Sequence, residues 1–304
     1  MRPVQTTRSG STASPICFAS ARATFPRTGD DWARRHRAAE RRSAATADTQ
    51  RNRKCSTVFG CASPFLPGRM LNARPLNLSR IEIVGALIFD FDGVIADSEA
   101  IANTVLAETV TRLGHATTLD EALTRYSGRR WDEAVAEIEA AIGRPLPSDF
   151  SGQLKLATLE RFRTNLKEVS GATDFIRRFA HIPRCIASSS SIDRLQLCLS
   201  VLALEWEFGG HVFSADMVAR GKPHPDIFLF AASKLGVHPD ECLVIEDSAG
   251  GIRAAVAAGM TVVGLCAASH IREGHDLKLR DAGAVHLAHS WSDVERFALH
   301  FFKG

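Results

Sequence analysis

The stretch ALIFDFDGVIADSE, residues 86–99, runs from an apolar segment directly into two aspartates, Asp90 and Asp92. The apolar segment begins at Ile81 and is nearly unbroken, which is typical of a parallel β-strand covered on both faces. Side chains two residues apart lie on the same side of an extended chain, so the two carboxylates repel each other. The sequence therefore predicts a buried strand whose end needs a cation.

Short apolar runs recur later in the chain and alternate with helical patterns. The runs are RCIASSS (184–190), HVFSAD (211–216), CLVIED (242–247) and TVVGL (261–265), and helices are predicted over 225–235 and 249–258. Strands that alternate with helices predict βαβ units. We therefore expect an α/β fold with a Rossmann-like core, an open parallel sheet.

The interval between the first two predicted strands is too long for one crossover. Residues 98–172 contain three stretches with apolar residues three and four apart: EAIANTVLAETVTRLG, WDEAVAEIEAAIG and SGQLKLATLERFRTNL. These stretches predict a small bundle, inserted as an α-helical cap domain. The catalytic core then comprises residues 81–97 and 173–304.

Residues 1–80 differ from the rest in charge. They hold 15 Lys and Arg against 4 Asp and Glu; subtracted from the chain's 37 and 34, this leaves 22 and 30, a net charge of −8, for residues 81–304. Such a polar, arginine-rich segment buries too little apolar surface to order, so we expect a disordered tail. A dispensable tail, with translation starting at Met70, is the favoured interpretation; a targeting peptide or a nucleic-acid arm are alternatives.

The seven cysteines form no CxxC pair, which is typical of a reduced, intracellular protein. No run of about 18 apolar residues is present, so we expect no transmembrane helix. We expect a cytoplasmic protein with a small-molecule partner and with neither a nucleic-acid nor a membrane partner. The oligomeric state is left open.

Polar side chains stand at the ends of the predicted strands. Each one alone is typical of a helix cap or a loop. Because ligands bind outside the carboxyl ends of parallel strands, we expect them to converge on one site. They are Asp90 and Asp92 after the first strand, Ser188 after the second, Lys222 in RGKPHPDIF, and Glu246 and Asp247 in CLVIED.

This ordered set resembles the four motifs of the haloacid dehalogenase (HAD) superfamily. DFDGV is similar to the first motif, Ser188 to the second, Lys222 in GKPHPDIF to the third and IEDSAGGIRAA to the fourth. The resemblance covers about residues 84–266 and includes a helical cap where one subgroup carries it. Within that subgroup it extends to sugar-phosphate phosphatases and β-phosphoglucomutases, which share the DSE continuation of the first motif.

The resemblance implies a role for each motif residue. Asp90 would attack phosphorus and become an aspartyl-phosphate, and Asp92 would protonate the leaving oxygen and then activate water. Ser188 and Ser189 would bind the phosphate, and Lys222 would hold its charge near the nucleophile.

A magnesium ion is the cofactor that the resemblance implies. Mg²⁺ prefers oxygen ligands and would offset the repulsion between carboxylates and phosphate. The candidate ligands are Asp90, Asp92, Glu246 and Asp247, together with a backbone carbonyl at or near Phe91.

The loop RYSGRRWDEA, residues 125–134, is the predicted specificity element of the cap. Gly128, Arg129 and Arg130 would face the substrate, with Trp131 offering an aromatic face. The alternative is a solvated turn in which Trp131 starts the next helix.

We expect a Mg²⁺-dependent phosphatase for a small phosphorylated metabolite, a sugar phosphate or a sugar-acid phosphate. The second acid, Asp92, favours phosphoryl transfer, because attack on carbon by a dehalogenase does not need it. The sequence contains no GxSxG motif of a Ser/His/Asp hydrolase, and no GxGxxG motif of a dinucleotide-binding protein follows the first strand. The alternatives are a β-phosphoglucomutase-like isomerase, although Ala102 stands where those mutases carry a histidine, and a non-catalytic phosphate-binding module.

Overall fold

The computed structural model describes residues 85–127 and 130–303 of the chain. The predictions for the tail, for strand residues 81–84 and for Gly128 and Arg129 lie outside these described residues. Within them, no helix is both long enough and apolar enough to cross a membrane.

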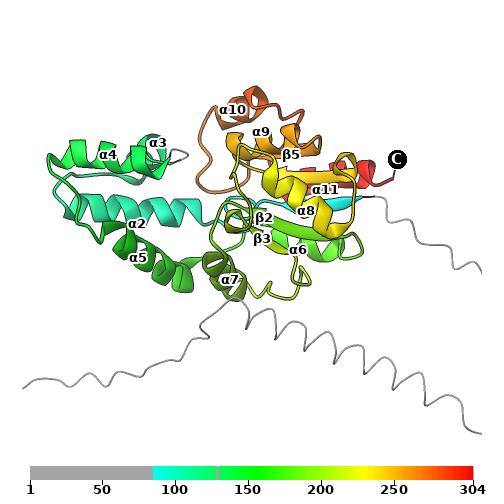
Figure 1. The fold of residues 1–304 in the computed structure, drawn as a ribbon, viewed down its shortest axis with the longest axis horizontal. Helices are drawn as coiled ribbons and strands as arrows, with labels where there is room; N and C mark the ends of the chain where they lie inside the picture. The colour runs from blue at the N-terminus through cyan, green and yellow to red at the C-terminus, as the bar shows by residue number, and fades with distance from the viewer. Residues whose placement is uncertain (1–84, 128–129, 304) are drawn as a thin grey trace, which may run out of the picture. The chain divides into compact units, whose positions relative to one another are not determined.

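The described residues form one parallel sheet of six strands in the order β3-β2-β1-β4-β5-β6 (Figure 1). The predicted open parallel, Rossmann-like sheet is confirmed. The sixth strand is an addition to the prediction. The strands are β1 (Ala86–Phe89), β2 (Arg184–Ser188), β3 (Val212–Ser214), β4 (Cys242–Glu246), β5 (Thr261–Leu265) and β6 (His286–Ala288).

Both faces of the sheet are covered, and β1 shows how. Leu87 and Phe89 belong to one apolar cluster and Ala86 and Ile88 to another, because successive side chains of a strand point to opposite faces. All four are fully buried, which explains why β1 reads as an unbroken apolar run. Helices α6 (Ala172–Arg178), α7 (Ile192–Val201) and α11 (Trp291–Phe301) cover the first face, and α8 (Asp226–Leu235), α9 (Ala249–Ala257) and α10 (His275–Asp281) the second.

Between β1 and α6, the described chain forms four helices that lie together beside the sheet (Figure 1). They bury a cluster of their own, which includes Val110, Ile138 and Phe150. The helices are α2 (Glu99–Arg112), α3 (Leu119–Arg125), α4 (Trp131–Ile142) and α5 (Phe150–Asn165). The boundaries at residues 98 and 172 between cap and core stay a prediction.

Helix α3 was absent from the predicted set because it is only seven residues long. Its start nevertheless carries a capping box: Thr118 accepts a hydrogen bond from the amide of Glu121, and Glu121 accepts one from the amide of Thr118. The pattern T-x-x-E before an apolar residue is the sequence signal for such a start. Two short 3₁₀ helices, η2 (Ala215–Met217) and η3 (Pro239–Glu241), precede α8 and β4.

Candidate active site

The register of the sheet brings three carboxylates together at its carboxyl edge. Phe89 pairs with Ile245, and the amide of Asp90 donates to the Ile245 carbonyl at 2.9 Å, so Asp90 lies level with Glu246. Asp247 follows directly. One carboxylate oxygen from each of Asp90, Glu246 and Asp247 lies within 4.8 Å of the others, and all three residues are buried. We call these three the carboxylate group.

Lys222 connects two members of the carboxylate group. Its ammonium lies 2.6 Å from Asp90 Oδ1 and 2.6 Å from Glu246 Oε2, and its side chain is only 6% exposed. Burial acts to lower the pKa of Lys222, but the two carboxylates outweigh burial and raise it above its usual value. Lys222 therefore stays charged and contacts Asp90, while its predicted role beside a nucleophile stays a prediction.

The carboxylate group carries more negative charge than Lys222 can balance. Burial, with the added charge of Glu246, raises the pKa of both Asp90 and Asp247 well above the usual value of a carboxyl group. A divalent cation would remove this excess, and three carboxylate oxygens form the hard donor set that Mg²⁺ prefers. The residues present thus fit a magnesium site.

Two glycines let the chain approach the carboxylate group. A Cβ on Gly93, which has a φ of +78°, would lie 1.7 Å from Asp247 Oδ2. A Cβ on Gly251 would lie 2.0 Å from the carboxyl carbon of Glu246. Any larger residue would therefore displace a carboxylate, which explains glycine in DFDG and in DSAGG.

Asp92 lies in a separate set of hydrogen bonds. Its carboxylate accepts from Ser98, from Ser190 at 2.5 Å and from Arg194 Nη2 at 2.5 Å. Burial alone raises the pKa of Asp92, but the Arg194 charge and the two hydroxyls outweigh burial, so the pKa lies below its usual value. Asp92 is not a member of the carboxylate group, and its predicted role as a metal ligand stays a prediction.

Arg194 also links Asp92 to the helices that precede α6. Its guanidinium lies 3.8 Å from Glu99 at the start of α2 and 5.0 Å from the centroid of the Phe162 ring on α5. The second contact is a cation–π interaction. Ser98, Ser190 and Arg194 were not predicted as site residues. Ser98 lies within the DSE continuation of the first motif, whereas nothing local to Ser190 or Arg194 indicates that they reach Asp92.

The three serines at the end of β2, Ser188, Ser189 and Ser190, differ in burial and in hydrogen bonds. Ser188 is buried at the end of β2, and its hydroxyl accepts from the amide of Ser190 at 3.1 Å. Ser189 is exposed. Ser190 is the serine whose hydroxyl reaches Asp92, so this serine belongs with the site although it was not singled out.

The Phe91 carbonyl makes backbone contacts. It accepts hydrogen bonds from the amides of Ile95 and Ala96, both at 2.9 Å. Since a carbonyl oxygen has two lone pairs, both are engaged in the turn. The contacts therefore give the Phe91 carbonyl no support as a metal ligand.

In the described part of the predicted specificity loop, Arg130 and Trp131 contact residues of α4 and α5. Arg130 precedes α4 and forms an exposed ion pair with Asp132 at 3.2 Å. Trp131 begins α4, stacks on the Phe150 ring at 6.2 Å between centroids, and donates to Ser151. These contacts match the helix-start interpretation for Trp131, and the substrate role of Arg130 stays a prediction.

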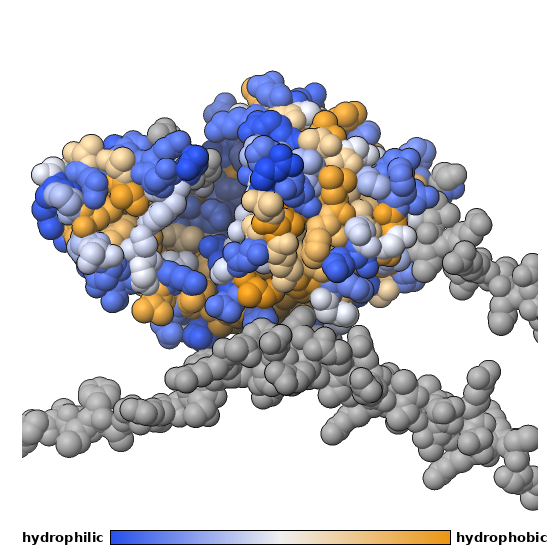
Figure 2. Space-filling model, viewed as in Figure 1, coloured by the Kyte–Doolittle hydropathy of each residue, from blue (hydrophilic) through white to orange (hydrophobic). Residues whose placement is uncertain are grey.

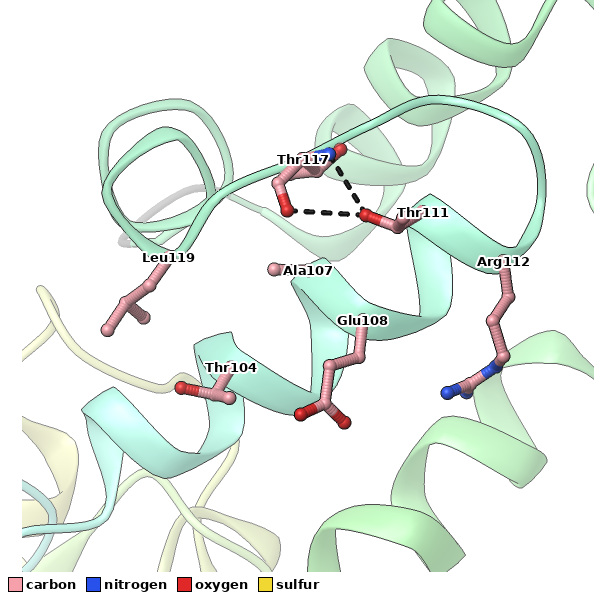
Figure 3. Close-up of a pocket in the computed structure, with 7 residues that line it drawn as sticks. All are labelled: Thr104, Ala107, Glu108, Thr111, Arg112, Thr117 and Leu119. Atoms are coloured by element: carbon pink, nitrogen blue, oxygen red, sulfur yellow. Dashed lines mark hydrogen bonds between the residues drawn. The ribbon is translucent and has the colours of Figure 1, made fainter.

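Figure 2 shows a hydrophilic hollow between helices α2–α5 and the part that contains the sheet. A cavity of about 420 Å³ is lined by α2, by Thr117 and by Leu119 at the start of α3 (Figure 3). A hydrogen bond between Thr111 and Thr117 lies beside it. Its lining contains none of the candidate site residues: Thr104, Ala107, Glu108, Thr111, Arg112, Thr117 and Leu119.

Comparison with known proteins assigns the chain to a family. Residues 84–259 match the family model of the haloacid dehalogenase-like hydrolases. The chain belongs to this family. The predictions of HAD membership and of a hydrolase are thereby confirmed.

The chain is also similar to individual proteins over most of their length. A 6-phosphogluconate phosphatase from Escherichia coli (strain K12) is 27% identical over 194 residues, 64% of this chain and 86% of the relative. A fructose-1-phosphate phosphatase from Escherichia coli (strain K12) is 30% identical over 183 residues, 60% and 96% of the two chains. A solved haloacid dehalogenase-like protein from Agrobacterium tumefaciens str. C58 is 36% identical, with a TM-score of 0.66, over 71% of this chain and 98% of that chain.

Proposed function

We propose that the protein is a Mg²⁺-dependent phosphatase that hydrolyses a small phosphorylated sugar or sugar acid. The observation that carries this proposal is the position of Asp90, beside the Lys222 ammonium and within the carboxylate group, with the separately held Asp92 two residues further on. Asp90 thus belongs to a set of carboxylates that could bind a cation, and Asp92 accepts hydrogen bonds from a guanidinium and two hydroxyls. Phosphoryl transfer through a carboxylate nucleophile needs both.

Asp90 is the proposed nucleophile. Lys222 binds its Oδ1, so Oδ2 is the oxygen that would attack phosphorus. In that step the new oxygen–phosphorus bond forms as the ester bond breaks, and the sugar oxygen leaves. When bound, Mg²⁺ would offset the negative charge of the carboxylates and of the phosphoryl group. Asp90, Asp247 and Glu246 would hold the ion, and Ser188 would donate a hydrogen bond to the phosphoryl group.

Asp92 is the proposed acid and base. It would give its proton to the leaving sugar oxygen and later take a proton from the water that cleaves the aspartyl-phosphate, which releases phosphate and restores Asp90. Arg194 and Ser190 hold Asp92 ionised in this arrangement, which suits the second step. The first step requires that Asp92 take up a proton before it acts.

The substrate class rests on the relatives and on one position in α2. The two curated relatives act on 6-phosphogluconate and fructose 1-phosphate, by their names. Ala102, which stands where the mutases carry a histidine, packs against the apolar cluster around Leu87. A methyl group cannot move a proton, so this position favours hydrolysis over isomerisation of a hexose phosphate.

Phosphate release from a panel of hexose, pentose and sugar-acid phosphates, with and without Mg²⁺, tests the proposal on the full chain. We expect Mg²⁺-dependent release that Asp90→Asn abolishes and that Asp174→Asn, an exposed aspartate on α6, leaves unchanged. Isomerisation of a hexose 1-phosphate without release would establish the mutase instead. Phosphate binding without turnover of any compound would establish the binding module.

A further inference from the structure

The loop between β5 and α10 brings a histidine to the carboxylate group that no motif accounts for. His270 Nε2 lies 3.3 Å from Asp247 Oδ2, and the His270 side chain is 11% exposed. Its ring also packs beside motif one, because a Cβ on Gly93 would lie 2.8 Å from the His270 Cε1 atom. His270 thus lies between Gly93 of the first motif and Asp247 of the fourth.

The chemistry of the pair defines which atom donates. His270 Nε2 and Asp247 Oδ2 are 3.3 Å apart. Because an ionised carboxylate only accepts hydrogen bonds, a hydrogen bond between them would be donated by His270 Nε2. Burial lowers the pKa of His270. Nδ1 is buried and has no hydrogen-bond partner among residues 85–127 and 130–303. The ring is therefore oriented by its contact with Asp247 and by packing.

The same loop is fastened at several further points. His275, at the start of α10, donates from Nε2 to the Asp247 backbone carbonyl at 2.6 Å. Ser269 donates from its amide and its hydroxyl to Asp97 Oδ1, at 3.0 and 2.8 Å. These bonds hold the loop against the segment that leads from β1 into α2, so the position of His270 is fixed from both sides.

The loop between β5 and α10 also contacts α3, one of the helices before α6. Arg272 donates to Asp120 of α3 from Nη2 at 2.9 Å and from Nε at 3.1 Å. Both side chains are substantially exposed, so this pair is weak compared with the buried contacts. Arg272 therefore offers a way to perturb the loop without touching Asp247.

We propose that His270 is a positioning residue for the magnesium site: its Nε2–H holds the Asp247 carboxylate in the orientation that completes the carboxylate group. This inference rests on the proposed function, since it assumes that Asp247 binds the ion. Groups that orient metal ligands commonly affect metal affinity by about 10- to 100-fold. His270 is not proposed to contact the substrate.

Binding of Mn²⁺, followed by the EPR signal of the free ion, tests the inference on the metal-free full chain without any turnover. Mn²⁺ accepts the same oxygen ligands as Mg²⁺. We expect His270→Ala to raise the dissociation constant at least tenfold. His270→Gln, whose side-chain nitrogen can replace Nε2, should stay within about threefold of the unmodified protein. Arg272→Gln, the matched control in the same loop, should change it less than twofold.

His270→Asn keeps a polar side chain but places its nitrogen at the Nδ1 position, so it should bind Mn²⁺ as weakly as His270→Ala. This variant carries the test if His270→Ala does not fold. Unchanged affinity in both variants would overturn the inference, as would equal weakening by His270→Gln. Asp247→Asn separates the two proposals, because unchanged Mn²⁺ binding in that variant would overturn the metal site itself.

Discussion

Replacing Lys222 by methionine removes the ammonium that contacts both Asp90 and Glu246 while it keeps a side chain of similar length. The two contacts are 2.6 Å each, and the partner side chains are 10% and 0% exposed. Removal of one partner from a buried ion pair costs about 3–5 kcal/mol, because the remaining charge is left without compensation. We expect Lys222→Met to lower the free energy of unfolding by about 4 kcal/mol at pH 8 without a divalent cation.

The loss should depend on pH with a definite sign. Burial and Glu246 already raise the pKa of Asp90, and loss of the Lys222 charge raises it further. A carboxyl group whose folded pKa lies above its unfolded value of about 3.9 favours the folded state at low pH and loses that contribution as the pH rises. The deficit of Lys222→Met should therefore shrink from pH 8 to pH 5, by up to about 1.4 kcal/mol per pH unit for each carboxyl group that titrates.

Urea unfolding followed by circular dichroism, in EDTA at pH 5, 6, 7 and 8, measures this deficit. Lys234→Met is the matched control, since Lys234 is an exposed lysine on α8 whose ammonium lies 5.1 Å from the centroid of the Phe230 ring. It should cost about 1 kcal/mol or less and show no trend with pH. A loss below about 1 kcal/mol for Lys222→Met at pH 8, or a loss that grows as the pH falls, would refute the reasoning.

Two further substitutions test close contacts in the site. Gly251→Ala should lower the free energy of unfolding by about 1–3 kcal/mol, because its Cβ would meet the buried Glu246 carboxylate. Gly250→Ala is the control: its Cβ would lie in open space, so it should be neutral or stabilising in the same urea titration. Arg194→Gln should lower kcat about tenfold without a change in Mn²⁺ affinity, because Arg194 holds Asp92 and not the carboxylate group; a kcat within twofold of the unmodified enzyme would contradict this.

The sheet could be predicted because its inner strands are buried on both faces. The predicted runs at 242–247 and 261–265 correspond to β4, Cys242–Glu246, and β5, Thr261–Leu265. β6 could not be found in this way, because it begins with the exposed His286 and only its last residue is buried. β3, which is equally short and also lies at an edge, is buried throughout and was predicted. A strand so short and so exposed leaves no periodic pattern in the sequence.

The candidate site could be predicted only where one element supplies a whole motif. Asp90 directly follows an apolar run, and Asp247 is the last residue of the run CLVIED. The position of each could therefore be predicted from the strand pattern. Arg194, Ser190 and His270 make their contacts through the way α7 and the β5–α10 loop pack against the sheet. That packing is set by the whole fold, and no spacing in one sequence encodes it.

The central place of β1 has a consequence for how the backbone exchanges its amide hydrogens with solvent. β1 is hydrogen-bonded on one side to β2 and on the other to β4, and the amides of Leu87 and Asp90 donate to Pro183 and Ile245, both at 2.9 Å. Such amides exchange only when the whole sheet opens, whereas an edge strand such as β6 frays locally. Deuterium should therefore enter β6 long before it reaches the backbone that carries Asp90, so the site keeps its geometry while the margin of the sheet opens and closes.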